Sequence, residues 1–120
     1  MSTKYKKINI TQHGKSRTKS RLGLRNRQAK QKINKAFREG LKHSECTGEL
    51  GLFANKVFFR SGQKANNIRI HKHNVYIFAG NNLITMYQIP ENLWELADRL
   101  EEEKAYKREM DRTFRMIKIE

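Results

Sequence analysis

Apolar residues recur at helical spacing in the first half of the chain. Residues 25–39 give the clearest case, because apolar side chains at i, i+4, i+7 and i+8 fall on one face of a helix. These are Ala29, Ile33, Ala36 and Phe37. Gly40 follows them and marks the end of the predicted helix. Residues 49–60 repeat the pattern more weakly, and their β-branched and aromatic end is equally compatible with a strand.

A shorter helix is expected from Thr11 to about Arg21. Thr11 is a suitable N-cap, since its side-chain oxygen can accept from a backbone N–H of the first turn. Gly23 would close the helix in a left-handed conformation. Gly14 lies inside this segment, and a glycine weakens a helix interior.

Alternation of apolar and polar residues replaces the helical period after residue 66. Residues 67–72, 75–80 and 82–89 each predict a short strand, and the links between them are turn-like. We therefore expect an antiparallel meander of three strands. Pro90 ends the last strand.

A long helix is predicted from Pro90 to Arg112, with one apolar stripe that stops at Leu100. Its second half is expected to project or to meet a partner. Residues 113–120 alternate again and predict a final strand. The whole order predicts an α+β fold, in which two or three N-terminal helices pack on one face of a small antiparallel sheet and a long C-terminal helix follows. We expect a single domain over residues 8–120, with a flexible basic tail at 1–7 and a charged helix at 91–112 that projects from it.

Positive charge is concentrated in the first part of the chain. The 120 residues carry 26 Lys and Arg against 12 Asp and Glu, a net charge of +14. Residues 1–73 hold 19 of these cations and 3 of the acids, whereas residues 74–120 are slightly acidic. A polyanion is the expected partner of the first part, nucleic acid before an anionic membrane, and RNA before DNA.

A single cysteine, Cys46, excludes an internal disulfide. No apolar run reaches the length of a membrane helix, and the N-terminus has no signal-peptide core. The sequence thus predicts a cytoplasmic protein, of the producing cell or of a target cell, that does not engage a membrane.

Three residues of the first predicted helix suit chemistry on RNA. His13, Arg17 and Arg21 are four residues apart and share a helix face. A neutral imidazole can take a proton from a 2′-hydroxyl, while guanidinium groups stabilise the charge that develops on the phosphate. Simple phosphate binding by the two arginines explains the same spacing, and for the triplet alone it is the favoured interpretation.

The third predicted strand carries a second candidate pair. Thr85 and Tyr87 should point to one face, while Ile84 and Met86 point to the other and suit the core. A tyrosine on an accessible face can stack on a base or hydrogen-bond a phosphate. Thr and Tyr are also ordinary strand residues, so the pair fits a purely structural role equally well.

The stretch ITQHGKSRTKSRLGL at 10–24, the helix ending at Gly40, and VYIFAGNNLITMYQIP at 75–90 resemble, in layout, the small phage- and toxin-associated ribonucleases of the barnase–EndoU–colicin–RelE group. The resemblance covers roughly residues 8–90. It implies a compact, metal-independent ribonuclease without a cofactor. Carried onto this chain, it implies four catalytic residues: His13, Arg17, Thr85 and Tyr87.

Further basic residues are predicted to contact nucleic acid. They are Lys15, Arg21, Arg25, Arg27, Lys30, Arg60, Arg69, His71 and His73. The two histidines alternate along one strand and are expected to share a face with Arg69. No cysteine or carboxylate lies near them in sequence, so no metal site is expected. His71 is also an alternative general base to His13.

The leading functional hypothesis is an RNA-binding, toxin-type endoribonuclease that cleaves without metal through attack of the 2′-hydroxyl. The alternative is a non-catalytic nucleic-acid-binding phage protein that regulates or inhibits a host nucleoprotein complex. A third hypothesis makes the helix at 91–112 the functional element, whose acidic face pairs with the basic face of another copy of the chain or binds an antitoxin or a host nucleoprotein.

Overall fold

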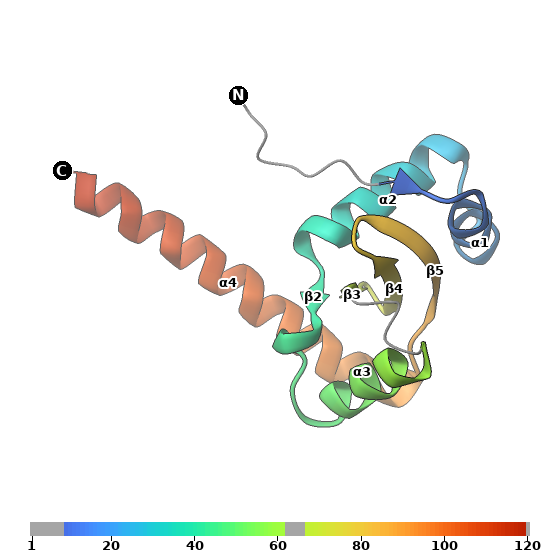
Figure 1. Cartoon of the computed structure of the whole chain (residues 1–120). Coiled ribbons are helices and arrows are strands. Elements are labelled where there is room, and N and C mark those ends of the chain that lie inside the picture. The colour runs from blue at the N-terminus through green and yellow to red at the C-terminus, as the bar shows by residue number, and fades with distance from the viewer. Residues whose placement is uncertain (1–8, 62–66, 120) are drawn as a thin grey trace.

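The computed structural model describes residues 9–61 and 67–119, so the predicted tail at 1–7 lies outside the described residues. The fold is α+β, as predicted (Figure 1). Helices surround a small sheet whose centre is the expected antiparallel meander, and a long C-terminal helix extends from this body.

The sheet has five strands in the order β1-β5-β4-β3-β2. Their bounds are β1 Asn9–Ile10, β2 Leu41–Lys42, β3 Asn67–His71, β4 Asn74–Ala79 and β5 Asn82–Gln88. β3, β4 and β5 confirm the three predicted strands. The two-residue strands β1 and β2 extend the sheet at its edges; β1 runs parallel to β5, and β2 runs antiparallel to β3. Strands this short leave no alternation that a sequence pattern could reveal.

The first three helices confirm the predicted boundaries within one residue, whereas the fourth was predicted over Pro90–Arg112 and begins and ends later. They are α1 Gln12–Leu22, α2 Asn26–Glu39, α3 Gly48–Arg60 and α4 Trp94–Ile119, with short 3₁₀ helices η1 His43–Glu45 and η2 Glu91–Leu93. At the start of α1 the Thr11 side chain accepts from the backbone N–H of Gly14, and at its end Gly23 adopts a left-handed φ of 64°. The segment 49–60, which was ambiguous in sequence, is helical in α3.

Helices cover both faces of the sheet, which corrects the expectation of one covered face. Val75 and Ile77 of β4 join a core cluster with residues of α3 and α4, such as Val57 and Ala97. The alternate residues of the same strand, Tyr76 and Phe78, join a second cluster with Ile33 and Ala36 of α2. Because successive strand residues point to opposite faces, the two clusters lie on opposite sides of the sheet.

A bulge in β5 changes which of its residues face the core. Thr85 pairs with Ile77 and Leu83 pairs with Phe78, so Ile84 is an extra residue with no partner in β4. Met86 is buried as predicted, but the side chain of Ile84 keeps 36% of its surface exposed. The expectation that Ile84 and Met86 share the core face was therefore wrong.

The predicted final strand at 113–120 was also wrong, because residues 113–119 continue α4. Figure 1 shows the second half of α4 projecting away from the sheet, where there is no strand edge to pair with. From the middle of α4 onward the large apolar side chains are exposed, namely Tyr106, Met110, Phe114, Met116 and Ile117. Among the described residues, none of the helices combines the length and the apolar character needed to cross a membrane.

Candidate nucleic-acid interface

Helix α1 lies along the outer edge of β5. The Thr11 hydroxyl donates to the carbonyl oxygen of Leu83 at 2.7 Å, and Nη1 of Arg21 donates to the carbonyl oxygen of Met86 at 2.8 Å. Gly14 permits this approach, because a Cβ at that position would lie 2.9 Å from the same Leu83 oxygen. The glycine that weakened the helix prediction is therefore what places α1 against the strand.

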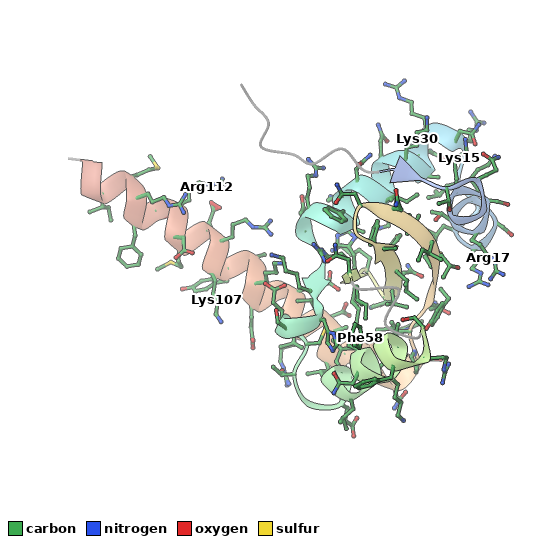
Figure 2. All side chains as sticks on the ribbon, viewed as in Figure 1. Lys15, Arg17, Lys30, Phe58, Lys107 and Arg112 are labelled. Carbon is green, nitrogen blue, oxygen red and sulfur yellow. The ribbon has the colours of Figure 1, made fainter. Side chains whose placement is uncertain are left out.

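The cations of α1 point in different directions. Figure 2 shows Arg17 projecting on the side of the molecule where α3 lies, whereas Lys15 and Lys30 project on the opposite side. Arg21, one turn beyond Arg17, is fixed at the β5 edge by its bond to Met86. The side chain of His13 lies outside the described part of the structure.

A pocket of about 350 Å³ opens between α3 and β5, and it contains both strand residues predicted from the sequence. Its lining, which we name the α3–β5 pocket, comprises Val57, Arg60, Ser61, Ile77, Ile84, Thr85 and Tyr87. Thr85 and Tyr87 thus share one surface, as predicted, and Arg60 joins them from α3. The surface they share is more apolar than expected, because Val57, Ile77 and Ile84 form much of its wall.

The phenol of Tyr87 lies in the field of two arginines from different helices. Burial raises the pKa of this hydroxyl, while the positive charges of Arg60 and Arg21 act in the opposite direction and lower it. Arg60 lines the same pocket as Tyr87, and Arg21 is bonded to the carbonyl oxygen of the preceding residue, Met86. Within the described structure, neither the Tyr87 hydroxyl nor the Thr85 hydroxyl has a hydrogen-bond partner. Arg60 forms no ion pair there either, so all three groups are free to bind a ligand.

A second positive region covers the outer surfaces of α1 and α2. Between residues 12 and 38 there are ten Lys and Arg and no Asp or Glu. Arg25, Arg27 and Lys30 are exposed, and none of the three forms an ion pair with a described carboxylate. We name the set Lys15, Lys19, Arg25, Arg27 and Lys30 the α1–α2 surface. Its unpaired charges are suited to contacts with a phosphate backbone.

Arg69 does not belong to this basic surface, although the sequence predicted a phosphate contact. It is 7% exposed, its Nε donates to the carbonyl oxygen of Phe37 at 3.0 Å, and its guanidinium lies over the Phe37 ring. Nη1 donates to Asn67 and to the carbonyl oxygen of Ile68. Arg69 therefore ties α2 to β3, and its Nε and Nη1 donors are used inside the protein.

The two histidines of the β3–β4 hairpin do not share a face, contrary to the prediction. Lys72 and His73 form a two-residue turn in which both have positive φ, so the strand alternation stops at His71. The His73 ring stacks on Trp94, with centroids 4.4 Å apart, and its Nε2 lies 2.9 Å from Asp98 of α4. His71 is 3% exposed and lines a cavity between α2 and α4.

The neighbours of His71 make it a poor general base. Burial, together with the charges of Lys32 and Lys72, lowers its pKa to about 4. It lines a polar cavity of about 390 Å³ with Lys35, Glu39 and Glu101, and its Nδ1 has no hydrogen-bond partner among the described residues. No group of three or more His, Cys, Asp or Glu in the described part of the chain could hold a metal ion.

The sequence did not predict the apolar wall of the α3–β5 pocket or the position of Arg21 at the β5 edge beside it. The bulge at Ile84 adds a residue to β5 without a sequence signal, and the position of α1 on the strand edge depends on tertiary contacts. Comparison of the chain with protein-family models, with curated proteins and with solved structures gives no match.

Proposed function

We propose that this protein binds RNA and cleaves it as a metal-independent endoribonuclease at the mouth of the α3–β5 pocket. The observation that carries the proposal is that Tyr87 and Arg60 line one pocket, while Arg21 of α1 is bonded to the carbonyl oxygen of Met86, the residue before Tyr87. Two guanidinium groups from separate elements beside an accessible phenol form a site that suits one phosphodiester group.

Each group has a definite part in such a reaction. The arginines would hold the non-bridging oxygens and stabilise the negative charge that grows on them as the 2′-hydroxyl attacks. Because its pKa is raised, Tyr87 stays protonated at neutral pH and can donate a hydrogen bond to the phosphate. His13, the base suggested by the sequence, would take the proton of the 2′-hydroxyl; the P–O5′ bond then breaks, the 5′-oxygen leaves with a proton from water, and a 2′,3′-cyclic phosphate remains. Arg17 projects toward the side of the molecule where α3 lies.

A second function, RNA binding without cleavage, is favoured by the α1–α2 surface. Lys15 and Lys30 project away from the side of α3, so phosphates bound there would be remote from the pocket. A chain that uses this surface alone would be a non-catalytic nucleic-acid-binding protein. It could regulate or inhibit a nucleoprotein complex.

The two functions are separated by incubating the purified chain with transfer, messenger and ribosomal RNA in the presence of a chelator. The ribonuclease proposal predicts fragments with 2′,3′-cyclic phosphate ends, a loss of about 100-fold or more in His13→Ala, and a loss of roughly tenfold in Tyr87→Phe. Tyr106→Phe, on the exposed part of α4, is the matched control and should cleave normally. If the protein binds RNA but leaves it intact, the binding function stands and the ribonuclease proposal is wrong.

A further inference from the structure

We infer, on the basis of the proposed function, that the protein takes RNA as a single strand and inserts one unpaired base into the α3–β5 pocket. The pocket combines two features that a phosphate site does not need. Its walls are largely apolar, with Val57, Ile77 and Ile84 on them, and the unpartnered hydroxyl of Thr85 lies among them.

A nucleobase matches both features. Its faces are apolar and aromatic, and they stack on aromatic rings or guanidinium planes, while its edges carry donors and acceptors that need partners. In this pocket the Tyr87 ring is half-buried and the Arg60 side chain is exposed at the rim. The free hydroxyl of Thr85 would meet the edge of the base and Ile84 would cover one face, while the Tyr87 hydroxyl stays with the phosphate at the mouth of the pocket.

The volume of the pocket also fits a base rather than a larger segment. About 350 Å³ is at the lower end of the range for small-ligand pockets, roughly 300–1,000 Å³. A phosphate attached to the inserted nucleotide would remain outside, within reach of Arg60 and of Arg21 at the β5 edge. The arginines at the rim thus match the phosphate of a nucleotide, and the apolar wall matches its base.

A double helix cannot use this site. In an A-form duplex the bases are stacked and paired, and only their edges are displayed in the grooves. A duplex could contact the α1–α2 surface through its phosphates, but it could not place a base between α3 and β5 without first breaking a pair. The site therefore discriminates between single-stranded and double-stranded RNA.

The test compares the affinity of the full chain for a fluorescent 12-nucleotide strand and for the same strand in a blunt duplex, at one salt concentration. Both carry 2′-fluoro sugars, which keep the A-form preference and cannot be cleaved by 2′-hydroxyl attack. Two variants alter the pocket: Ile84→Asn makes its wall polar, and Tyr87→Leu removes its aromatic ring. Leu52→Asn is the matched control, because Leu52 is an exposed residue of α3 outside the pocket.

We expect the wild-type chain to bind the single strand at least tenfold more tightly than the duplex. Each pocket variant should lose about five- to 50-fold for the single strand, the scale of one lost stacking contact, and should bind the duplex as before. Leu52→Asn should change neither affinity. Equal wild-type affinity for the two RNAs, which needs no variant to measure, would overturn the inference and leave RNA binding standing. Absence of binding to either RNA would overturn the proposed function as well.

Discussion

Single residues decide how α1 meets the sheet. Gly14 is unfavourable for a helix in isolation, yet its missing side chain lets the helix backbone approach Leu83. Thr11 has two roles at the same place, since its hydroxyl accepts from Gly14 N and donates to Leu83 O. The tertiary contact thus overrides the low helix propensity of glycine. The same contact positions Arg21, whose guanidinium donates to the carbonyl oxygen of Met86 in β5.

His71 is expected to make the fold sensitive to acid. Its pKa is about 4 in the folded protein and near 6.5 when exposed. Between these values the unfolded chain binds a proton that the folded chain excludes, so the free energy of unfolding should fall as pH is lowered from 6.5 to 4. The loss should reach up to about 3 kcal/mol and stop below pH 4.

Urea unfolding at several pH values, compared between wild type and His71→Gln, measures this contribution. Subtracting the two curves removes the effects of other groups, including Glu101, whose pKa burial raises. His43→Gln is the control, because His43 is bonded to Asn55 at the surface and should leave the slope intact. Parallel curves for wild type and His71→Gln would show that His71 is not excluded from protonation in the folded state.

At the level of whole elements, the sequence predicted those helices and strands that local periodicity and capping determine. The apolar spacing of α2, the cap of α1 and the alternation of β3–β5 each depend on neighbours within a few residues, and each was confirmed. The second covered face of the sheet, the bulge at Ile84 and the position of the predicted turn, at Lys72 and His73 instead of 73–74, depend on how elements pack together. These tertiary features are the ones that were missed.

In the candidate site too, residue types were predicted from the sequence, whereas their surroundings depend on packing. Thr85, Tyr87 and Arg60 were each recognised as residue types suited to RNA, and the structure brings them to one pocket. Arg69 has the same residue type, but its position beneath α2 uses its donors for packing. Sequence gives the chemical capacity of a side chain, whereas burial and partners determine whether a ligand can reach it.

The end of α4 is expected to contribute little to stability. Residues 113–117 are exposed, and the described contacts of this segment stay within the helix, as in the bond from Thr113 to Glu109. A chain ending at Arg112 should therefore have a free energy of unfolding within about 0.5 kcal/mol of that of the full chain.

By contrast, Lys104→Ala should lower the free energy of unfolding by about 1–3 kcal/mol, because Lys104 donates to Gly40 O at 2.7 Å and to Glu45 at 2.8 Å.

Chemical denaturation of both variants checks this prediction, and light-scattering masses of the full and shortened chains can be recorded on the same samples. A marked loss of stability on shortening, at unchanged mass, would mean that the last turns of α4 pack on the body. A full-chain mass above that of a monomer, lost on shortening, would assign the exposed apolar residues Phe114, Met116 and Ile117 to self-association.

Across the whole molecule, the position of charge should matter more than its amount. Arg27 and Lys30 belong to the α1–α2 surface, whereas Lys107 and Arg112 lie on the projecting part of α4, and Figure 2 shows these two regions well separated. Replacing either pair with glutamine lowers the net charge equally, from +14 to +12. If RNA phosphates contact the α1–α2 surface, only the first replacement removes contacts that release counterions.

The expected result is a change in the salt dependence of RNA binding. A plot of log affinity against log salt for a single-stranded RNA should become shallower by about 1.4 in Arg27→Gln/Lys30→Gln, which corresponds to two phosphate contacts. Lys107→Gln/Arg112→Gln should keep the wild-type slope. Equal changes in the two variants would show that RNA responds to the total charge of the protein, and the α1–α2 surface would then have no special part in binding. Since the two variants differ only in where the charge is removed, the comparison isolates the location of the interface from the general attraction of a basic protein for a polyanion.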